Sequence, residues 1–311
     1  MKKLISIVTP CLNEEGNVEL LYDKVKEIMS NYKQYDYEHI FIDNSSTDRT
    51  VPILKEIAKK DKRLKIIVNT RNFGAIRSPI HAILQANGEV IINISADFQD
   101  PPPELIPEFI KKWEEGYKIV LGVKKNSQEN ALMFLIRKFY YNLVNKISNI
   151  DLIKNATGFG LYDREIVNIL RKIDDPYPYL RGILCEIGFN IAKIYYVQQK
   201  RKKGITKNNF YILYDYAMLG IVSSSKVPLR FATFFGFGFS ILNLIVAFVY
   251  LVYKLLFWKS FSLGIAPIVI GLFFFFSVNL FFLGIVGEYI LAIYTQVLKR
   301  PLVIEKERIN F

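Results

Sequence analysis

The sequence has few of the residues that build disulfide frameworks or histidine-based active sites. Its 311 residues include two cysteines, Cys11 and Cys185, and two histidines, His39 and His81. The cysteines fit no metal-ligand spacing and no disulfide framework, as expected for a protein of a reducing compartment. Neither histidine shares a motif with a nucleophile, which argues against a histidine-based catalytic triad.

Several other features are absent. No apolar run opens the chain, so we expect no secretory signal peptide, and the first 230 residues should stay on the side of synthesis. The sequence contains no internal repeat and no low-complexity linker. Its formal net charge of +12 suits a protein that lies against anionic lipid and handles phosphates. Nucleic acid is the other usual partner of such charge, but no nucleic-acid-binding motif is present.

Hydrophobic residues make up 51% of the chain, and the excess lies near the C-terminus. Two segments, residues 231–253 and 263–287, contain no charged side chain, and each is long enough to cross a bilayer as a helix. The short connection between them predicts a helical hairpin. More lysines and arginines lie before the first segment and after the second than in the connection between them. This distribution of positive charge predicts a multi-pass protein of the plasma membrane with both termini in the cytoplasm.

The first 122 residues alternate short apolar runs with helical patterns. Strands are predicted at residues 4–9, 40–42, 64–68, 89–94 and 119–122, and helices at 18–32, 50–60, 76–86 and 104–115. This alternation predicts an α/β fold, with a mostly parallel sheet and helices on both faces. Such sheets bind ligands at the carboxyl ends of their strands. We therefore expect one cleft, lined by the loops at residues 10–14, 43–48, 71–74 and 95–100.

An acidic loop follows the predicted strand that ends at residue 94. It contains Asp97 and Asp100, and the prolines at 101–103 set up the next helix. Asp97 and the amide oxygen of Gln99 are hard oxygen ligands of the kind that hold Mg²⁺ or Mn²⁺ against a diphosphate. The alternative is a solvated acidic turn ahead of a helix.

Two further helices are predicted near the membrane. In residues 132–147 the apolar side chains fall on one helical face, so this helix either packs on the core or lies in the membrane interface, which we favour. Residues 210–222 are rich in tyrosine and lie just before the first apolar span, where aromatic belts occur.

Several motifs resemble glycosyltransferase family 2. Residues 8–15 (VTPCLNEE) resemble its opening motif, and residues 43–48 (DNSSTD) resemble its Asp-Asp-Gly-Ser-x-Asp nucleotide loop. Residues 71–74 (RNFG) and 96–102 (ADFQDPP) match the branch that makes polyprenyl-phosphate sugars, which includes dolichyl-phosphate mannose synthase and bacterial undecaprenyl-phosphate glucosyltransferases. Residues 204–207 (GITK) resemble its Gly-x-Ser/Thr-Lys motif, with Arg201 upstream. The resemblance extends from residue 5 to residue 301.

The resemblance implies a Rossmann-like GT-A fold, a UDP- or GDP-sugar donor, and a divalent ion, Mg²⁺ or Mn²⁺, held by Asp97 and Gln99. Pro10 and Glu14 would border the nucleotide, and Asp43 would recognise the base or ribose; a turn cap is the alternative role for Asp43. The donor-site residues that we expect are Pro10, Leu12, Glu14, Asp43, Ser45, Asn72, Ser95, Ala96 and Asp97.

The acceptor implied by the resemblance is undecaprenyl phosphate or another polyprenyl phosphate. Arg137, Arg201, Thr206 and Lys207 are the residues that we expect to bind its phosphate. The alternative is that the basic stretch around Arg201 only touches lipid headgroups.

The sequence departs from the family pattern at three places. Ser95 replaces the first Asp of Asp-x-Asp, and Gly158 and Gly160 replace the Asp and Arg of Gly-Asp-Phe-Arg-Leu, whose Asp is the family's proposed base. Glu186 takes an aromatic position. A phosphate monoester is already largely ionised at neutral pH, so it needs positioning more than deprotonation. We hypothesise that Glu186 supplies a replacement carboxylate, against the alternative of a solvated glutamate near a helix end. The catalytic candidates are Asp97, Glu186 and Arg201.

These inferences predict a cytoplasmic catalytic domain followed by a transmembrane hairpin. The expected boundaries are residues 1–207 for the catalytic domain with an interfacial helix at about 130–149, 208–230 for a juxtamembrane helix, 231–293 for the hairpin and 294–311 for a cytoplasmic tail. The expected reaction is inverting sugar transfer, from a UDP-hexose in the first place, to a polyprenyl phosphate for cell-surface glycan modification. The alternatives are another membrane acceptor, a glycolipid or glycan, and an impaired relative acting as a scaffold. The family implies a homo-oligomer, often a tetramer.

Overall fold

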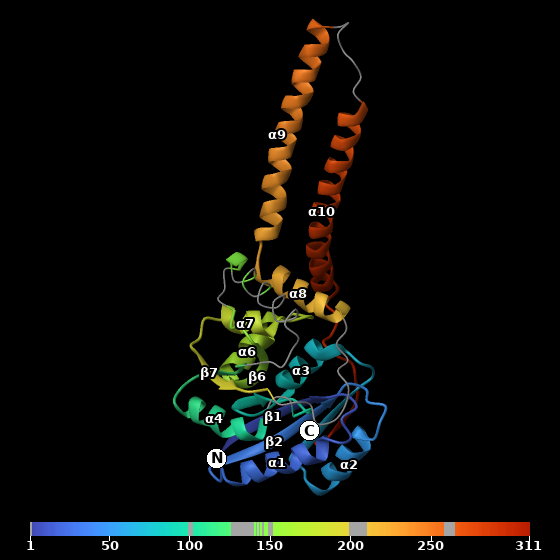
Figure 1. The fold of residues 1–311 in the computed structure, drawn as a ribbon. Coiled ribbons are helices and arrows are strands. Elements are labelled where there is room, and N and C mark those ends of the chain that lie inside the picture. The colour runs from blue at the N-terminus through green and yellow to red at the C-terminus, as the bar shows by residue number, and fades with distance from the viewer. Residues whose placement is uncertain are drawn as a thin grey trace.

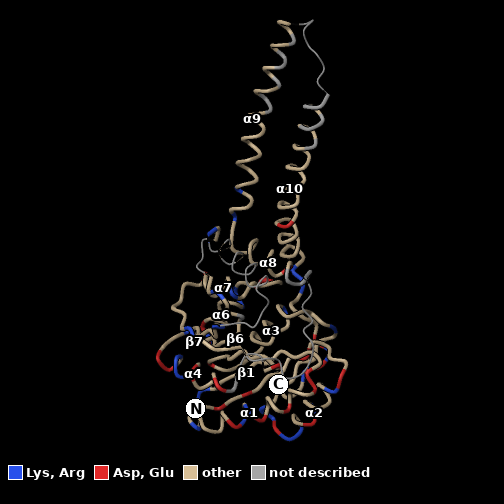
Figure 2. Tube along the Cα trace, in the orientation of Figure 1, with Lys and Arg blue, Asp and Glu red and all other residues tan. Residues whose placement is uncertain are grey.

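The structure is a computed structural model that describes residues 2–98, 102–125, 140, 142, 144, 146–148, 152–198, 210–257 and 265–311. Figure 1 shows an α/β domain from which two long helices, α9 (Val227–Leu256) and α10 (Ile265–Leu298), project side by side. Helix α8 (Phe210–Ser224) lies between this hairpin and the α/β domain. Charged residues gather on the α/β domain, and the two long helices consist almost entirely of other residues (Figure 2).

The described strands form one sheet in the order β7-β5-β6-β4-β1-β2-β3-β8. Their bounds are β1 (Lys3–Cys11), β2 (Tyr35–Asp43), β3 (Leu64–Asn69), β4 (Val90–Asn93), β5 (Ile119–Lys124), β6 (Ala156–Asp163), β7 (Ile191–Tyr196) and β8 (Glu305–Ile309). Four of these seven pairings are parallel: β1 with β2 and with β4, β2 with β3, and β5 with β7. Strand β6 runs antiparallel to β4 and β5, and β8 runs antiparallel to β3, so the sheet is mixed.

Helices cover both faces of the sheet (Figure 1). One face packs against α1 (Val18–Ser30), α2 (Thr50–Lys60) and α4 (Pro102–Glu114), and the other against α3 (Gly74–Gln85), α6 (Arg164–Ile173) and α7 (Leu180–Glu186). Neighbouring residues of β1 show that one strand contributes side chains to two cores, one on each face of the sheet. Ile7 packs into the first core and Val8 into the second, because successive side chains of a strand point to opposite faces.

The predicted α/β alternation is confirmed for the first 124 residues, where every predicted strand and helix is present. Helix α2 has the predicted bounds, Thr50–Lys60. The later strands β6, β7 and β8 were not predicted. Strand β8 in particular is polar, and it comes from the segment after the hairpin that we expected to be a tail.

Residues around position 144 connect α7 and α8. Val144 is fully buried and packs in a small core with Tyr179 and Leu152. The hydroxyl of Tyr140 donates to the carbonyl of Ala217 in α8 at 3.3 Å. These contacts place Tyr140 and Val144 against the rest of the protein, whereas Asn142 and Lys146 are exposed. Most of the interfacial helix predicted at 130–149 lies outside the described residues.

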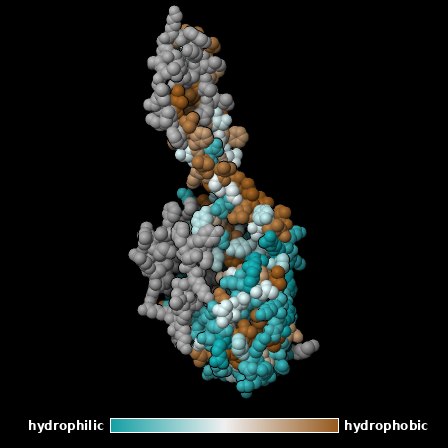
Figure 3. Space-filling model, turned by 90° about the vertical axis from the view of Figure 1, so that its right-hand side faces the viewer, coloured by the Kyte–Doolittle hydropathy of each residue, from teal (hydrophilic) through white to brown (hydrophobic). Residues whose placement is uncertain are grey.

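Helix α10 contains a candidate membrane span, Phe274–Leu298, with a mean hydropathy of 1.9. None of its residues in the most apolar window is buried inside the protein, and Figure 3 shows hydrophobic residues at the base of the hairpin and on its coloured part. The described apolar run of α9, Val227–Leu242, is shorter than a span. Two crossings at 231–253 and 263–287 therefore stay a prediction.

Candidate functional site

The loops that follow β1 and β2 are locked together by side-chain-to-backbone hydrogen bonds. The amide N–H of Asn13 donates to the hydroxyl of Ser46 at 2.8 Å, and the N–H of Thr47 donates to Oδ1 of Asn13 at 2.8 Å. Asn13 has a φ of 56°, in the left-handed region that asparagine tolerates. Two of the four loops predicted to converge therefore meet at the carboxyl edge of the sheet.

Glu14 lies at the start of the segment that leads into α1. Its side chain is buried, and Oε2 accepts a hydrogen bond from the amide of Asn17 at 2.6 Å. Its backbone N–H donates to the hydroxyl of Thr50 in α2 at 2.8 Å. Pro10 and Leu12, the two other residues expected here, are half-buried. The carboxylate of Glu14 is therefore held in one orientation beside the β2 loop.

Asp43 ends β2 and is fully buried. Its carboxylate accepts hydrogen bonds from both the backbone N–H and the hydroxyl of Ser46. The intervening Ser45 adopts a φ of 68°. Burial raises the pKa of Asp43, although the bonds from Ser46 oppose that effect. The carboxylate of Asp43 therefore holds the turn of the β2 loop through its bonds to Ser46.

Asn44 connects the β2 loop to the loop after β3. Its Oδ1 accepts from the side-chain amide of Asn69 at 3.1 Å and from the N–H of Phe73 at 2.9 Å. Its amide nitrogen donates to Oδ1 of Asn72 at 2.8 Å and to the carbonyl of Gly74 at 3.2 Å. This one buried side chain therefore fixes the loop at residues 71–74, and with it the expected donor residue Asn72.

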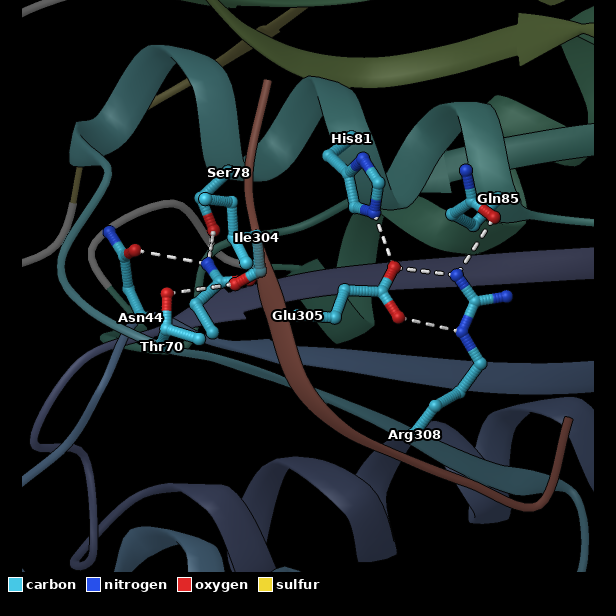
Figure 4. A network of polar contacts seen from close by, with 9 residues as sticks. Asn44, Thr70, Ser78, His81, Gln85, Ile304, Glu305 and Arg308 are labelled. Atoms are coloured by element: carbon cyan, nitrogen blue, oxygen red, sulfur yellow. Dashed lines mark hydrogen bonds and ion pairs between the residues drawn. The ribbon is translucent and has the colours of Figure 1, made fainter. Parts of the chain in front are cut away.

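The segment after α10 supports the same loop from outside (Figure 4). The carbonyl of Ile304 accepts from both the N–H and the hydroxyl of Thr70, at 2.9 and 3.1 Å. Glu305 pairs with His81 of α3 at 2.6 Å and with Arg308 of its own strand. Residues that lie before and after the hairpin in the sequence thus hold the loop at residues 71–74.

The loop after β4 carries Ser95, Ala96 and Asp97. Ala96 is buried, Ser95 and Asp97 are half-buried, and the N–H of Ile94 donates to the carbonyl of Val8 in β1 at 2.9 Å. Phe98 has a φ of 56° and packs its ring in the first core, which holds this loop next to the β1 loop. The fourth predicted loop therefore lies beside β1, with its carboxylate half-buried.

Asp97 is the one carboxylate that the structure describes in the loop after β4, so it is the candidate ligand for a divalent ion. Within the part of the chain that the structure describes, no three His, Cys, Asp or Glu side chains gather as a metal cluster. Gln99, the second expected ligand, lies outside the described residues. The donor set fits an ion that takes an oxygen from Asp97 and its remaining ligands from a diphosphate and water.

Strand β6 explains one departure from the family pattern. A Cβ at Gly160 would overlap the carbonyl oxygen of Val120 in the neighbouring strand, so no larger side chain fits without a backbone shift. Gly158 has a φ of 84°, and its carbonyl accepts from the side chain of Asn93 at 2.8 Å. Both glycines are thus required by the close approach and the conformation of β6.

The remaining candidates are placed only in part. Glu186 is exposed at the C-terminal end of α7. Arg137, Arg201, Thr206 and Lys207, the expected acceptor-phosphate residues, lie outside the described residues. Asn44 and Asn69, which connect the loops after β2 and β3, were not predicted. The Asn at the second position of the DNSSTD motif was the signal that pointed to one of them.

Residues 6–170 match the family model described as Glycosyl transferase family 2. The Bacillus subtilis (strain 168) protein CsbB, named as a glycosyltransferase, is 35% identical over 305 residues, covering 98% of this chain and 92% of that one. The SfII prophage-derived bactoprenol glucosyl transferase of Shigella flexneri is 32% identical over 304 residues, covering 97% of both chains. The crystal structure of a mycobacterial protein matches 71% of this chain and 73% of that one, at 16% identity and a TM-score of 0.51.

Proposed function

Because the chain belongs to glycosyltransferase family 2 and is a glycosyltransferase with a GT-A fold, we propose that it transfers a sugar from a nucleotide sugar to a polyprenyl phosphate. One observation carries this proposal: the similarity to a bactoprenol glucosyl transferase covers 97% of both chains, so it includes the hairpin as well as the α/β domain. The donor that we propose is a UDP-hexose, and the acceptor is undecaprenyl phosphate.

The donor side of the site supports nucleotide binding. Asp43 is a buried carboxylate suited to accept hydrogen bonds from the N–H of a base or the hydroxyls of a ribose. In this proposal Pro10, Leu12 and Glu14 border the nucleotide from the β1 loop. Ser45 and Asn72 border it from the loops after β2 and β3. Since these loops are already bonded to one another, little ordering is left for the donor to impose.

Asp97, with Ser95 and Ala96 beside it, would hold the donor's diphosphate through Mg²⁺ or Mn²⁺. When bound, such an ion neutralises the negative charge that grows on the leaving nucleoside diphosphate. Asp97 supplies an oxygen ligand from a half-buried position, and we assign the second protein ligand to Gln99. In this arrangement the carboxylate of Asp97 would orient the leaving group rather than the nucleophile.

The acceptor phosphate is the nucleophile, and it attacks the anomeric carbon in line, which inverts the configuration. As an anion at neutral pH it needs alignment more than a base. We assign this alignment to Arg201, Thr206 and Lys207 by their place in the sequence motifs, and to Arg137 by its place in the predicted interfacial helix. Glu186 is the candidate for a carboxylate near the sugar. If it acts as a base, Glu186→Gln cuts kcat steeply; equal kcat in this variant and the wild type would remove Glu186 from the mechanism.

The membrane topology that we propose has two crossings, with the α/β domain and both termini in the cytoplasm. Strands β1 to β7 precede the hairpin and β8 follows it, yet all belong to one sheet. The chain therefore leaves the domain and returns to it on one side of any membrane, which requires an even number of crossings. The apolar surface of the hairpin and the candidate span in α10 support two crossings rather than none.

The test is formation of a lipid-linked product by the full-length protein in detergent. Undecaprenyl phosphate and Mn²⁺ or Mg²⁺ are combined in turn with labelled UDP-glucose, UDP-galactose, UDP-N-acetylglucosamine or GDP-mannose. We expect label to enter the lipid phase with one donor, and to be lost on chelation and in Asp97→Ala. Asp36→Ala is the matched control, since Asp36 is an exposed carboxylate near the amino end of β2, away from the carboxyl edge of the sheet where Asp97 lies.

Two other outcomes would replace this proposal. Transfer to diacylglycerol or a glycan, but not to undecaprenyl phosphate, would identify another membrane acceptor. Donor binding without transfer to any acceptor would identify a scaffold that has lost activity.

A homo-oligomer, as a tetramer, is a further part of the proposal, and light scattering on the purified protein measures it.

A further inference from the structure

Two arginines flank one aromatic ring where α3 begins. The guanidinium of Arg71 lies 4.1 Å from the centroid of the Phe73 ring, and that of Arg77 lies 5.2 Å from the same centroid. Arg77 also donates to the carbonyl of Pro301 at 2.6 Å, and Pro301 directly follows Arg300. Arg71, Arg77 and Arg300, which we call the arginine cluster, thus meet where the chain leaves α10.

The arginine cluster has no ion-pair partner among the described residues. No ion pair is recorded there for any of its members, and the partners of Arg71 and Arg77 are main-chain carbonyls and the Phe73 ring. The Nε of Arg77 is buried without a hydrogen-bond acceptor in the same described set. An arginine that is half-buried beside like charges is costly unless an anion compensates it.

Carboxylates do lie near this corner, since Asp174 and Asp175 line one cavity with Arg300, but neither forms a recorded ion pair with the cluster. Asp215 of α8 accepts from the hydroxyl of Tyr177 at 2.9 Å. Asp175 accepts from the side-chain amide of Gln296 at 2.7 Å and from the N–H of Tyr177 at 2.8 Å. Burial lowers the pKa of Arg77, and Arg71 and Arg300 lower it further, whereas Tyr177 opposes them. The surroundings of Arg77 thus disfavour its charge in the absence of a bound anion.

We propose that the arginine cluster is a binding site for a phosphate group, separate from the residues assigned above to the donor and the acceptor. A guanidinium presents a planar set of N–H donors that matches phosphate oxygens, and Arg77 is already held in place by Pro301. Its buried Nε is a donor that a phosphate oxygen would satisfy. Arg300 is exposed and is therefore open to an incoming ligand.

The position of the cluster suggests where the phosphate comes from. The candidate span ends at Leu298, and Arg300 follows two residues later, at the foot of α10 where Figure 2 shows basic residues. If the hairpin lies in a bilayer, which rests on the proposed function, the cluster is level with the headgroups. The phosphate then belongs to an anionic lipid headgroup, and a free phosphate is the other source of the same chemistry.

A phosphate bound here would join α10 to the donor side of the site. Arg71 and Phe73 belong to the loop that Asn44 fixes, and Pro301 and Arg300 belong to the segment that leaves the hairpin. The site thus offers a way for the lipid composition at the membrane surface to stabilise the donor loop.

The test measures ligand binding by isothermal titration calorimetry on the full-length protein in a neutral detergent. The probes are dihexanoyl-phosphatidylglycerol below its micellar concentration, inorganic phosphate, and UDP. We expect Arg77→Gln and Arg300→Gln each to weaken phosphatidylglycerol binding about tenfold or more, the usual effect of losing one charge-assisted hydrogen bond. Arg63→Gln is the matched control, because Arg63 lies at the opposite end of β3 and is paired with Asp61 at 2.7 Å.

The probes distinguish the sources of the phosphate. Weakened binding of phosphatidylglycerol alone identifies a lipid headgroup, and weakened binding of inorganic phosphate as well identifies a site open to free phosphate. Arg300→Gln guards against misfolding, since its side chain is exposed and bonds to nothing described. Equal affinities in wild type and both variants would overturn the proposal. An equal fall in UDP affinity would also overturn it, because these arginines would then belong to the donor site.

The outcome is independent of sugar transfer. Asp97→Ala should bind phosphatidylglycerol as the wild type does. If transfer to every acceptor fails while the arginine variants still lose phosphatidylglycerol binding, the proposed function falls and the phosphate site stands. If transfer succeeds and the variants bind phosphatidylglycerol normally, the proposed function stands and the phosphate site falls.

Discussion

The carbonyl oxygen of Ile304 accepts hydrogen bonds from both the backbone N–H and the hydroxyl of Thr70, at 2.9 and 3.1 Å. These residues are 234 positions apart in the sequence, and the hairpin lies between them. Thr70 directly follows β3 and precedes the loop that carries Asn72. The segment that returns from the hairpin is therefore part of the scaffold of the proposed donor site.

Removal of residues 303–311 should destabilise the protein. The deletion exposes the edge of β3, removes the buried side chain of Val303, and leaves Thr70 without its carbonyl partner. We expect a loss of about 3 kcal/mol or more, from one buried aliphatic side chain and several hydrogen bonds. Thermal unfolding of the protein in detergent measures it.

Smaller changes isolate the bond itself. Thr70→Val should cost about 1 kcal/mol, whereas Thr70→Ser keeps the hydroxyl and should cost less. A truncated protein that melts at the wild-type temperature would show that β8 contributes nothing to the stability of the sheet.

Replacement of Asn44 should weaken donor binding more than it slows turnover at saturating donor. Asn44→Ala removes three hydrogen bonds that fix the loop at residues 71–74 and one from Asn69 of β3, so the loop must be ordered when the nucleotide sugar binds. We expect a rise in donor KM of about tenfold, in line with 1–3 kcal/mol for buried polar groups left unpaired. Initial rates at varied donor concentration measure it, with exposed Asn31→Ala as the control. A fall in kcat with unchanged KM would contradict this role.

Ser45 holds a backbone conformation that glycine adopts without strain. Its φ of 68° is costly for a residue with a side chain, by about 1–2 kcal/mol. Ser45→Gly relieves the strain but increases the entropy of the unfolded chain, so we expect stability equal to the wild type or up to about 1 kcal/mol higher. Ser45→Val should lose about 1–2 kcal/mol. Equal melting temperatures for the glycine and valine variants would argue against a left-handed Ser45.

His39 should make the protein sensitive to acid. It is fully buried, its Nε2 lies 2.9 Å from the hydroxyl of Thr9, and burial lowers its pKa from 6.5 to about 3. The unfolded chain takes up a proton near pH 6.5 and the folded chain only near pH 3. The contribution of neutral His39 is therefore complete above pH 6.5 and is lost progressively as the pH falls toward 3.

The expected loss of stability between pH 7 and pH 5 is about 2 kcal/mol. Melting temperatures at the two pH values measure it in the wild type and in His39→Gln, which should show a flatter dependence. His81→Gln, which alters the other histidine, is the control. An equally steep dependence in His39→Gln would assign the acid sensitivity to other groups.

The pattern of strands and helices up to residue 124 was predictable because each element carries its own signal. The apolar runs of β1, β3 and β4 are local, and so is the helical spacing of α1 and α2. The motif loops were predictable for a related reason, since a parallel sheet brings the carboxyl ends of its strands to one edge. The structure confirms that the loops after β1, β2 and β3 are bonded to one another.

Other features had no local signal. Strand β8 is polar and short, and it becomes a strand because the edge of β3 offers unpaired hydrogen-bonding groups. The role of Asn44 depends on four partners from two other segments, and no spacing rule encodes such a set. The arginine cluster likewise joins residues more than 220 positions apart.

The sequence by itself determined the family, the α/β class and the apolar character of the hairpin, because motifs and hydrophobic periodicity are properties of neighbouring residues. Tertiary structure alone decided that the chain returns from the hairpin into the sheet, that Asn44 fixes the loop at residues 71–74, and that Arg77 lies half-buried beside other arginines. These features depend on which distant segments pack together, and that choice is made by the free energy of the whole fold rather than by any single segment.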